Sequence, residues 1–358
     1  MNRLNSIMVT GGAGFIGSNF IRFVFNRDDF NGIIVNVDKL TYAGNLCNLQ
    51  DIDERYGGTT YFFEKADIGD YNAIKEIVNK YNVDTIVNFA AETHVDRSIY
   101  GPSEFINTNI IGTFTLLEVS REAFNKNKYF HFHHISTDEV YGSLGKEGYF
   151  YENSAFDPRS PYSASKASSD HLVSAYFHTY GLPVTISNCS NNYGPYQFPE
   201  KLIPLMIINM INEKQLPVYG DGKHIRDWLY VDDHNSALWK ILTNGLMGET
   251  YNIGGNSEWE NIKLLNELCE KTARFMGKDK DYYKKLITFV ADRPGHDRRY
   301  AINCDKIKLQ LGWKQKYTFE TGLDLTVQWY LNNKDWVERI QTGAYKEWLT
   351  IHYGDRNR

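Results

Sequence analysis

The sequence predicts an α/β protein in which a doubly wound parallel sheet is followed by a smaller C-terminal substrate-binding domain. Apolar runs of strand length alternate with segments of helix length, a glycine-rich turn follows the first run at 6–10, and polar residues end the later runs. A length of 358 residues suggests about two domains. We expect the first domain to cover 1–190 and the second 191–358, with the second interleaved with the first.

The glycine-rich turn has the spacing of a dinucleotide-binding loop. Gly11, Gly14 and Gly17 let the chain turn tightly, let backbone amides approach a pyrophosphate, and let the next helix pack closely on the strand. The second apolar run ends at Asp38, about 20 residues past the loop, where a carboxylate would hold the adenosine ribose hydroxyls. The pattern predicts a Rossmann-type site for NAD. Asp38 favours NAD over NADP, although the neighbouring Lys39 weakens that preference.

The alternation of strands and helices continues to about residue 190 and then weakens. The small residues Ala90 and Ala91 end one strand and would let a cofactor lie against the backbone, and Asp67 is placed to meet the adenine. The expected strands cover 33–37, 61–64, 84–89, 129–135 and 183–188, and the expected helices cover 71–81, 102–124 and a segment that begins with a capping serine at 160 and a proline at 161. Beyond residue 190 we expect a hairpin-like turn at 216–222, a strand from 226 that enters a helix, and a cationic loop at 291–299.

Composition and charge exclude several classes of partner. The net charge of −5 gives no overall basic character for binding nucleic acid or an anionic membrane. The longest apolar run, 202–211, is far too short to span a bilayer. The four cysteines are widely spaced and form no CxxC pair, which favours reduced thiols and a cytoplasmic location. We therefore expect neither a nucleic-acid partner nor a membrane partner.

Three histidines crowd the expected strand at 129–135. His131 and His133 share one face of that strand, and His134 points to the opposite face. No acidic or cysteine partner completes a set of metal ligands. We interpret the three histidines as ordinary strand residues and expect no metal.

Two segments are expected to carry the chemistry. Thr137, Asp138 and Glu139 follow a buried apolar run, and in an open α/β sheet ligands bind beyond the carboxyl ends of the strands. Tyr162 and Lys166 are four residues apart and share one face of a helix. Both segments are therefore expected to face the cofactor.

A tyrosine with a lysine one turn later, beside a nicotinamide, can act as the base that oxidises an alcohol. The lysine charge and the helix N-terminus favour phenolate, which lowers the tyrosine pKa from its usual value of about 10. Thr137 can hydrogen-bond the same alcohol oxygen. Adjacent carboxyls repel as anions, so one is held neutral and can donate to a departing hydroxyl while the other removes a proton beside the new ketone. These residues together predict oxidation of an alcohol, elimination of water beside the new ketone and return of the hydride, with NAD regenerated.

Alternative functions remain open at this point. A nucleotide-sugar 4-epimerase needs the tyrosine–lysine pair but has no use for adjacent carboxyls. A GDP-mannose or UDP-sugar dehydratase would share the chemistry and differ in the pocket for the nucleotide base. A non-catalytic NAD sensor would not need the intact set of Thr137, Asp138, Glu139, Tyr162 and Lys166.

The diphosphate of a nucleotide sugar could be bound by bidentate arginine clamps. The candidates are Arg226, Arg293, Arg298 and Arg299.

Five motifs resemble those of a known family, at 38–45, 92–98, 137–142, 191–195 and 293–297. With the glycine loop, they resemble the extended short-chain dehydrogenases/reductases that act on nucleotide sugars, and among these the dTDP-glucose 4,6-dehydratases, over about residues 7 to 315. The resemblance implies that Asp138 donates a proton to the leaving C6 hydroxyl, that Glu139 is the base at C5 and that Tyr162 is the base at the C4 hydroxyl. It also implies a homodimer formed by the helices after residues 101 and 162.

The resemblance further assigns two sets of binding residues. Besides the loop glycines, it places NAD on Phe15, Ile16, Asp38, Lys39, Leu40, Thr41, Asp67, Ile68, Ala90, Ala91, Thr108, Tyr162, Lys166 and Asn192. It places the substrate, dTDP-glucose, on Thr93, Thr137, Asn191, Lys201, Leu202, Pro217, Val218, Tyr219, Arg226, Asn261, Asp292, Arg293, Pro294, Gly295 and His296.

Overall fold

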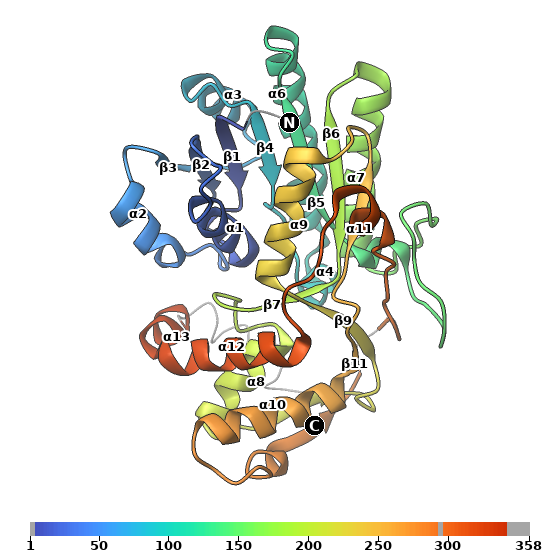
Figure 1. Cartoon of the computed structure of the whole chain (residues 1–358). Helices are drawn as coiled ribbons and strands as arrows, with labels where there is room; N and C mark the ends of the chain where they lie inside the picture. The colour runs from blue at the N-terminus through green and yellow to red at the C-terminus, as the bar shows by residue number, and fades with distance from the viewer. Residues whose placement is uncertain (1–3, 293–295, 342–358) are drawn as a thin grey trace.

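A seven-stranded parallel sheet forms the centre of the molecule, as the computed structural model shows (Figure 1). The structure describes residues 4–292 and 296–341. Three residues of the expected substrate site, Arg293, Pro294 and Gly295, lie outside the described residues. The strand order is β10-β6-β5-β4-β1-β2-β3, and every pairing is parallel. The strands are β1 (Ser6–Thr10), β2 (Ile33–Asp38), β3 (Tyr61–Lys65), β4 (Thr85–Asn88), β5 (His131–Thr137), β6 (Val184–Cys189) and β10 (Thr250–Ile253).

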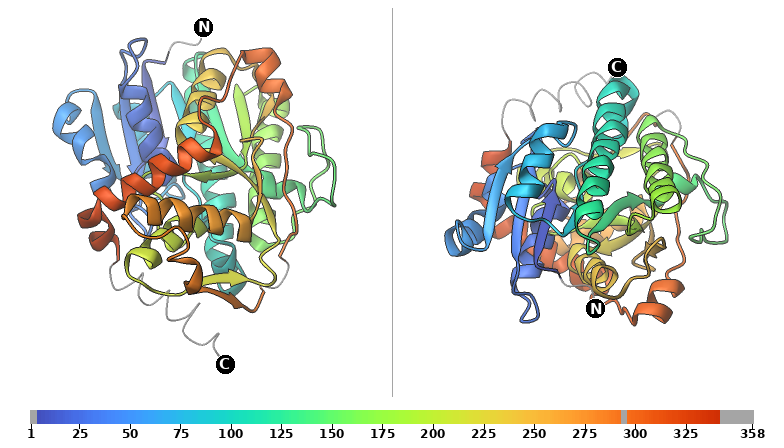
Figure 2. Two further views of the ribbon diagram at one scale, coloured as in Figure 1. Left: turned by 60° about the horizontal axis from the view of Figure 1, so that its bottom comes forward. Right: turned by 90° about the horizontal axis from the view of Figure 1, so that it is seen from above.

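Helices cover both faces of this sheet (Figure 2). One layer contains α1 (Phe15–Phe25), α9 (Val231–Asn244) and α11 (Asp305–Leu311), and the other contains α3 (Tyr71–Lys80), α6 (Thr113–Lys126) and α7 (Pro161–Tyr180). Shorter elements connect them: η1 (Leu46–Leu49), α2 (Gln50–Tyr56), α4 (Val95–Tyr100), α5 (Pro102–Phe105), the π-helical η2 (Ile106–Gly112) and η3 (Asp138–Tyr141). The prediction of a doubly wound parallel sheet is confirmed.

The chain after residue 190 builds the lower part of the molecule in Figure 1 and also returns to the main sheet through α9 and β10. Two small sheets and four helices form this part. The small sheets contain β7 (Asn191–Tyr193), β9 (Ile225–Tyr230) and β11 (Glu258–Glu260), and β8 (Leu216–Tyr219) with β12 (Ile287–Val290). The helices are α8 (Leu202–Ile211), α10 (Asn261–Phe275), α12 (Phe319–Asn332) and α13 (Lys334–Ile340), with a short η4 (Lys284–Leu286).

The expected hairpin-like turn at 216–222 is found only in its second half, at 219–222, where the Gly222 amide donates to the Tyr219 carbonyl oxygen at 3.1 Å. Leu216 to Tyr219 forms β8, which pairs in parallel with β12 and not with the strand that follows the turn. Pro217 is tolerated in β8 because this strand lies at the edge of a two-stranded sheet. Its partner strand is too distant in sequence for a local pattern to reveal it.

The C-terminal helices, for which the sequence offered no motif, contact the glycine loop indirectly. The Trp336 indole of α13 donates to Asn48 Oδ1 at 2.8 Å, and Asn48 Nδ2 donates to the carbonyl oxygen of Ala13 at 2.9 Å. Trp336 is buried against Tyr196 and Trp329. The last helix thus helps to hold the loop in place.

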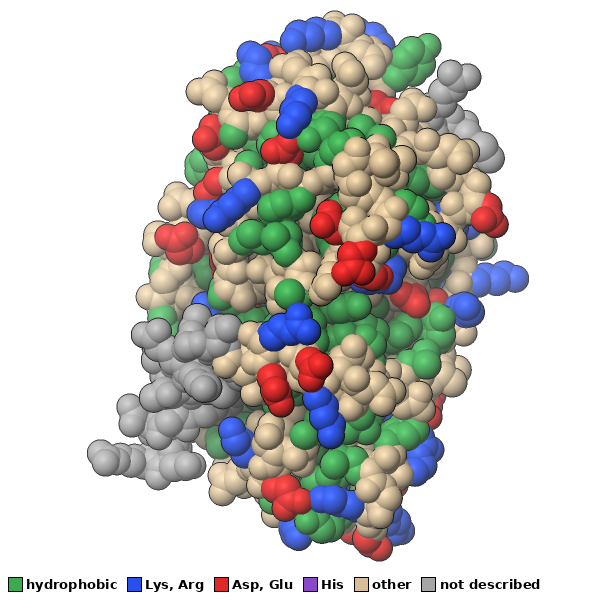
Figure 3. All heavy atoms as spheres, turned by 90° about the vertical axis from the view of Figure 1, so that its left-hand side faces the viewer, with side chains coloured by type: hydrophobic (Ala, Val, Ile, Leu, Met, Phe, Trp, Pro, Cys, Tyr) green, Lys and Arg blue, Asp and Glu red, His purple; other side chains and the backbone are tan. Residues whose placement is uncertain are grey.

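The surface carries charges of both signs. On the face shown in Figure 3, Lys and Arg side chains are interspersed with Asp and Glu side chains, and neither sign gathers into a broad patch. Among the described residues, no helix has both the length and the apolar character needed to cross a membrane.

Candidate active site

Two adjoining cavities open beyond the carboxyl ends of the main strands. The first has a volume of about 330 Å³ and lies over the glycine loop, and the second, of about 180 Å³, lies between the main sheet and the small sheets. They share seven lining residues: Thr93, Glu139, Asn191, Asn192, Gln197, Glu200 and Lys201. A ligand in one cavity can therefore meet a ligand in the other.

The first cavity collects the residues expected to bind the cofactor. All of them except Leu40 line it, namely Gly11, Gly14, Phe15, Ile16, Gly17, Asp38, Lys39, Thr41, Asp67, Ile68, Ala90, Ala91, Thr108, Tyr162, Lys166 and Asn192. The backbone amide of Leu40 donates to Asp38 Oδ1 at 2.8 Å, so Leu40 orients the carboxylate and its own side chain stays outside the lining. Lys39 forms an ion pair with Asp67 at 2.7 Å.

The glycine loop has the shape that a dinucleotide requires. Gly11 adopts a φ of 66°, and a Cβ on Gly17 would lie 2.5 Å from the Gly11 carbonyl oxygen, so neither position accepts a side chain without strain. Helix α1 starts after Gly14 without a side-chain cap, and Phe15 and Ile16 of its first turn line the cavity. Uncapped amides at a helix N-terminus suit a pyrophosphate. Together with the buried Asp38 carboxyl, this donor and acceptor set fits NAD.

Glu139 lines both cavities, and its neighbour Asp138 lines the first. Thr137 caps the short helix η3 by accepting from the Glu139 amide at 3.3 Å, which fixes the direction in which both carboxyls leave the strand. Asp138 is 2% exposed, and its Oδ2 has no hydrogen-bond partner among the described residues. Burial raises the pKa of Asp138 well above its usual range, and the charges of Glu139 and Asp227 add to this. This increase favours the protonated form of Asp138, as expected for one member of a pair of adjacent carboxyls.

Tyr162 and Lys166 reach the first cavity from α7. As predicted, Ser160 caps this helix and Pro161 occupies its first position; Ser160 and Ser163 form a reciprocal capping box. Burial raises the pKa of the Tyr162 phenol well above its usual value, and Glu139 adds to the increase, while a hydrogen bond with Thr137 opposes it. The expected lowering of this pKa by Lys166 is therefore not seen in the chain alone, because loss of solvent outweighs it.

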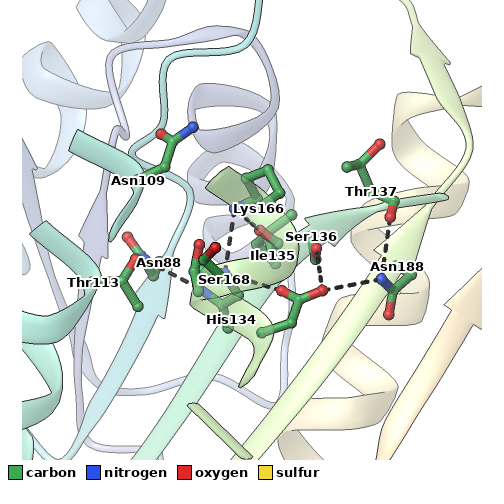
Figure 4. Close-up of polar contacts among 12 residues, drawn as sticks. Asn88, Asn109, Thr113, His134, Ile135, Ser136, Thr137, Lys166, Ser168 and Asn188 are labelled. Carbon is green, nitrogen blue, oxygen red and sulfur yellow. Dashed lines mark hydrogen bonds and ion pairs between the residues drawn. The ribbon is translucent and has the colours of Figure 1, made fainter. Parts of the chain in front are cut away.

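The structure corrects the interpretation of His134 as an ordinary strand residue. Its Nε2 lies 3.3 Å from Lys166 Nζ, which also donates to the Ile135 carbonyl oxygen at 2.8 Å (Figure 4). The other two histidines do form the opposite face of β5, as expected. His131 and His133 both hydrogen-bond the Thr185 hydroxyl, and burial lowers the pKa of His131 to about 4.

One group of possible metal ligands lies elsewhere, at His224, Asp292 and His296. His296 Nδ1 is 2.6 Å from Asp292 Oδ1, and the two imidazoles are stacked 3.6 Å apart with nearly parallel planes. Stacked rings cannot both direct a nitrogen lone pair, in the ring plane, at one ion between them. Asp292 instead contacts both stacked histidines, and of these His296 lines the second cavity.

A family model described as GDP-mannose 4,6 dehydratase matches residues 8–326. The chain belongs to this family. A dTDP-glucose 4,6-dehydratase of Shigella flexneri is 52% identical over 364 residues, covering 98% of this chain and 99% of its own length. The crystal structure of a dTDP-glucose 4,6-dehydratase from Bacillus anthracis in complex with NAD is 48% identical with a TM-score of 0.83, covering 94% of this chain and 99% of that one. A UDP-glucose 4-epimerase from Thermotoga maritima is 28% identical with a TM-score of 0.81, covering 92% and 99%.

The second cavity collects most residues expected to bind the dehydratase substrate. Its lining contains Thr93, Asn191, Lys201, Leu202, Pro217, Val218, Tyr219, Arg226, Asn261 and His296, while Thr137 lines the first cavity. Asp292 lines neither and hydrogen-bonds His296, which lines the second.

Two of the four arginines proposed as diphosphate clamps are committed elsewhere. Arg298 makes a bidentate pair with Asp221 at 2.9 and 3.0 Å, and Arg299 makes one with Glu258. Neither lines a cavity. Of the described arginines in that set, only Arg226 faces the second cavity, where its guanidinium lies 4.3 Å from the Tyr300 ring centre.

Sequence reasoning missed two residues that line both cavities of this dehydratase fold, Gln197 and Glu200. Glu200 accepts from the Tyr42 hydroxyl at 3.1 Å, and burial raises the pKa of the Glu200 carboxyl. Both residues follow the motif at 191–195 in a segment with no pattern of its own. Its position directly before Lys201 was the only available signal for Glu200.

Proposed function

We propose that this chain catalyses the NAD-dependent dehydration of dTDP-glucose to dTDP-4-keto-6-deoxyglucose, a step of deoxysugar biosynthesis. The observation that carries the proposal is the adjacent pair Asp138 and Glu139: Glu139 lines both cavities, and Asp138 lines the first, is buried and has its pKa raised well above its usual range. An epimerase has no use for this pair. The 52% identity to dTDP-glucose 4,6-dehydratases over nearly the whole chain supports the same choice.

The first step is oxidation of the C4 hydroxyl. Tyr162 takes the hydroxyl proton, Thr137 hydrogen-bonds the same oxygen, and the Lys166 ammonium lies one helical turn from the phenol. NAD held by the residues of the first cavity would supply the acceptor for the C4 hydride and would return that hydride to C6, so no net oxidant would be consumed. The protein must hold the C4 hydroxyl against Tyr162, which lines the cofactor cavity.

The second step is elimination of water across C5 and C6. The C4 ketone makes the C5 proton acidic, Glu139 removes it, and neutral Asp138 donates its proton to the C6 hydroxyl, which leaves as water. Return of hydride to C6 and of a proton to C5 completes the product. Two adjacent carboxyls suit this order of steps, because one must be anionic while its neighbour is protonated.

Arg226 is proposed to bind the diphosphate. It is 9% exposed and donates to the carbonyl oxygens of Ile225 and Asp297, which directs the guanidinium at the second cavity. A guanidinium suits phosphate oxygens through charge-assisted, paired hydrogen bonds.

Replacing Arg226 by alanine should raise KM for dTDP-glucose by about 10- to 100-fold, since a charge-assisted hydrogen bond contributes about 1.5–3 kcal/mol. Diphosphate binding acts equally on the ground and transition states, so kcat should change little. Arg298→Ala is the matched control, because Arg298 is exposed and pairs with Asp221 outside both cavities. A collapse of kcat at unchanged KM would assign Arg226 to the chemistry instead.

The proposed function is tested by incubating the purified protein with NAD and dTDP-glucose, GDP-mannose or UDP-glucose in separate reactions. A 4-keto-6-deoxy product, lighter than the substrate by one water, should form with dTDP-glucose at the highest kcat/KM. Preferential turnover of another nucleotide sugar would move the proposal to that substrate. An isomer of unchanged mass would favour the epimerase.

We also propose a homodimer formed by the helices after residues 101 and 162. Large apolar side chains are exposed on α4, η2 and α6, including Tyr100 at 72%, Ile111 at 48% and Phe114 at 44%. A second copy would remove this surface from water. Light scattering of the purified chain tests the homodimer proposal.

We further propose that the chain divides near residue 190 into a cofactor-binding part and a substrate-binding part. We also propose a cytoplasmic location, because all four cysteines are free.

A further inference from the structure

A buried network of charged and polar side chains surrounds the end of the Lys166 side chain (Figure 4). Lys166 is 4% exposed, His134 0% and Asp170 3%. Lys166 Nζ and Asp170 Oδ1 lie 3.3 and 3.4 Å from the same atom, His134 Nε2. An isolated charge in such a place costs several kcal/mol, so the network must balance its own charges.

The hydrogen bonds of Asn88 fix where His134 carries its proton. Asn88 Oδ1 accepts from the Thr10 hydroxyl at 2.7 Å, which leaves Asn88 Nδ2 to face His134 Nδ1 at 3.2 Å. Since an amide nitrogen only donates, His134 Nδ1 must be the acceptor and Nε2 must hold the ring hydrogen. His134 Nε2 and the Lys166 ammonium then present hydrogens to each other, an arrangement that needs an anion at the same place.

Asp170 is in position to be that anion. It follows Lys166 by one turn of α7, and its Oδ2 accepts from the Ser136 hydroxyl at 2.7 Å and from Asn188 Nδ2 at 3.4 Å. Two donors on Oδ2 hold the carboxylate so that Oδ1 faces His134. No other part of the proposed reaction uses Asp170, which lines neither cavity.

We propose that Asp170 is a positioning residue whose carboxylate keeps the buried Lys166 ammonium protonated and, through His134, holds it against β5. The inference rests on the proposed role of Lys166 beside Tyr162. Lys166 needs such a partner because burial lowers its pKa to about 8 even with Asp170 opposing the decrease. Burial raises the pKa of Asp170 to about 7, and Lys166, Ser136 and Asn188 resist that rise. Each group therefore stabilises the charged form of the other.

The other titratable groups around Lys166 do not replace Asp170. Tyr162 on the same helix is neutral in the chain alone, His134 on β5 is held neutral by burial, and the Cys189 thiol of β6 has its pKa raised by burial to about 12. Burial raises the pKa of Asp138, beyond the end of β5, well above its usual range, which favours its neutral form. Neither Asp138 nor the neighbouring Glu139 is among the groups that shift the pKa of Lys166, whereas Asp170 raises it.

Asp170→Asn in the NAD-loaded full-length enzyme tests the inference. Loss of the anion should move the alkaline limb of the kcat–pH profile down by about one pH unit, because Lys166 then loses its proton at lower pH. The titration of the Lys166 ammonium itself, followed by nitrogen-15 nuclear magnetic resonance of labelled lysine as the difference from Lys166→Met, should move to lower pH as well, because the anion that favours the charged form is gone. Ser169→Ala is the control, since this buried hydroxyl bonds only to Ser165 within α7. It should move neither titration.

Two further variants keep the test decisive. Ser136→Ala leaves the Asp170 charge in place and removes one of its donors, so it should shift both titrations in the same directions by less. In a Lys166→Met background, Asp170→Asn should have no further effect on the kcat–pH profile. Unchanged titrations in folded Asp170→Asn would overturn the inference. An equal shift caused by Asp170→Asn in the Lys166→Met background would also overturn it. If Asp170→Asn does not fold, the absence of any shift in Ser136→Ala would overturn it instead. Normal turnover by Lys166→Met would instead remove the proposed role of Lys166.

Discussion

Tyr162→Phe should lower kcat by about 10²- to 10⁴-fold, equivalent to roughly 3–5 kcal/mol of barrier, while the fold and NAD binding persist. The substitution removes only the phenolic oxygen, which is the proposed acceptor of the C4 hydroxyl proton. Because burial and Glu139 raise the pKa of this phenol, the site depends on positioned positive charge to form phenolate at all.

Tyr141→Phe is the matched control for this prediction. Tyr141 is also a buried tyrosine near the end of β5, and its hydroxyl donates to Asn252 Oδ1 at 2.9 Å, away from both cavities. Its loss should cost about 1 kcal/mol of stability and leave turnover close to that of the unaltered enzyme. Near-normal kcat in Tyr162→Phe, measured with dTDP-glucose under saturating conditions, would remove the first step of the proposed reaction.

Glu139→Gln should stop the reaction after oxidation at C4. The amide keeps the size and hydrogen bonding of the carboxylate but cannot accept the C5 proton, so elimination cannot follow. With substrate present, the absorbance of the reduced nicotinamide should rise to about one equivalent per site while no product appears. Stopped-flow absorbance and mass analysis of the quenched mixture measure the two quantities separately.

Glu152→Gln provides the comparison for this variant. Glu152 accepts a hydrogen bond from the backbone amide of Asn252 at 3.0 Å and lines neither cavity. The same substitution at Glu152 should therefore leave turnover unchanged. Product formation by Glu139→Gln at the normal rate would show that another group takes the C5 proton. Failure to reduce the nicotinamide would place Glu139 in the first step.

The parts of the fold that the sequence predicted are those with local causes. The glycine loop, the acidic end of β2 at Asp38 and the capped start of α7 at Ser160 each follow from residues within a few positions of one another. Alternation of side chains along β5 likewise placed His131 and His133 opposite His134. These features depend on backbone geometry, which short patterns encode.

The parts that could not be predicted depend on partners distant in sequence. The sequence suggested Arg298 and Arg299 as diphosphate ligands, but in the structure they pair with Asp221 and Glu258. The parallel pairing of β8 with β12 has the same origin. For Tyr162, the sequence suggested the favourable charge of a nearby lysine, but the extent of burial that opposes it is a property of the whole fold.

The most direct measurement of the proposed dehydration follows two hydrogen labels in one reaction. Substrate carrying deuterium at C4 should give product with that deuterium at C6, because the hydride stays on the cofactor between its two transfers. Turnover in heavy water should place solvent deuterium at C5, since Glu139 exchanges the proton that it removes. Nuclear magnetic resonance of the product reads both positions. If the C4 label instead remained at C4 with inverted configuration, and C5 took up no solvent deuterium, the assignment of Asp138 and Glu139 to water elimination would be contradicted and a 4-epimerase supported.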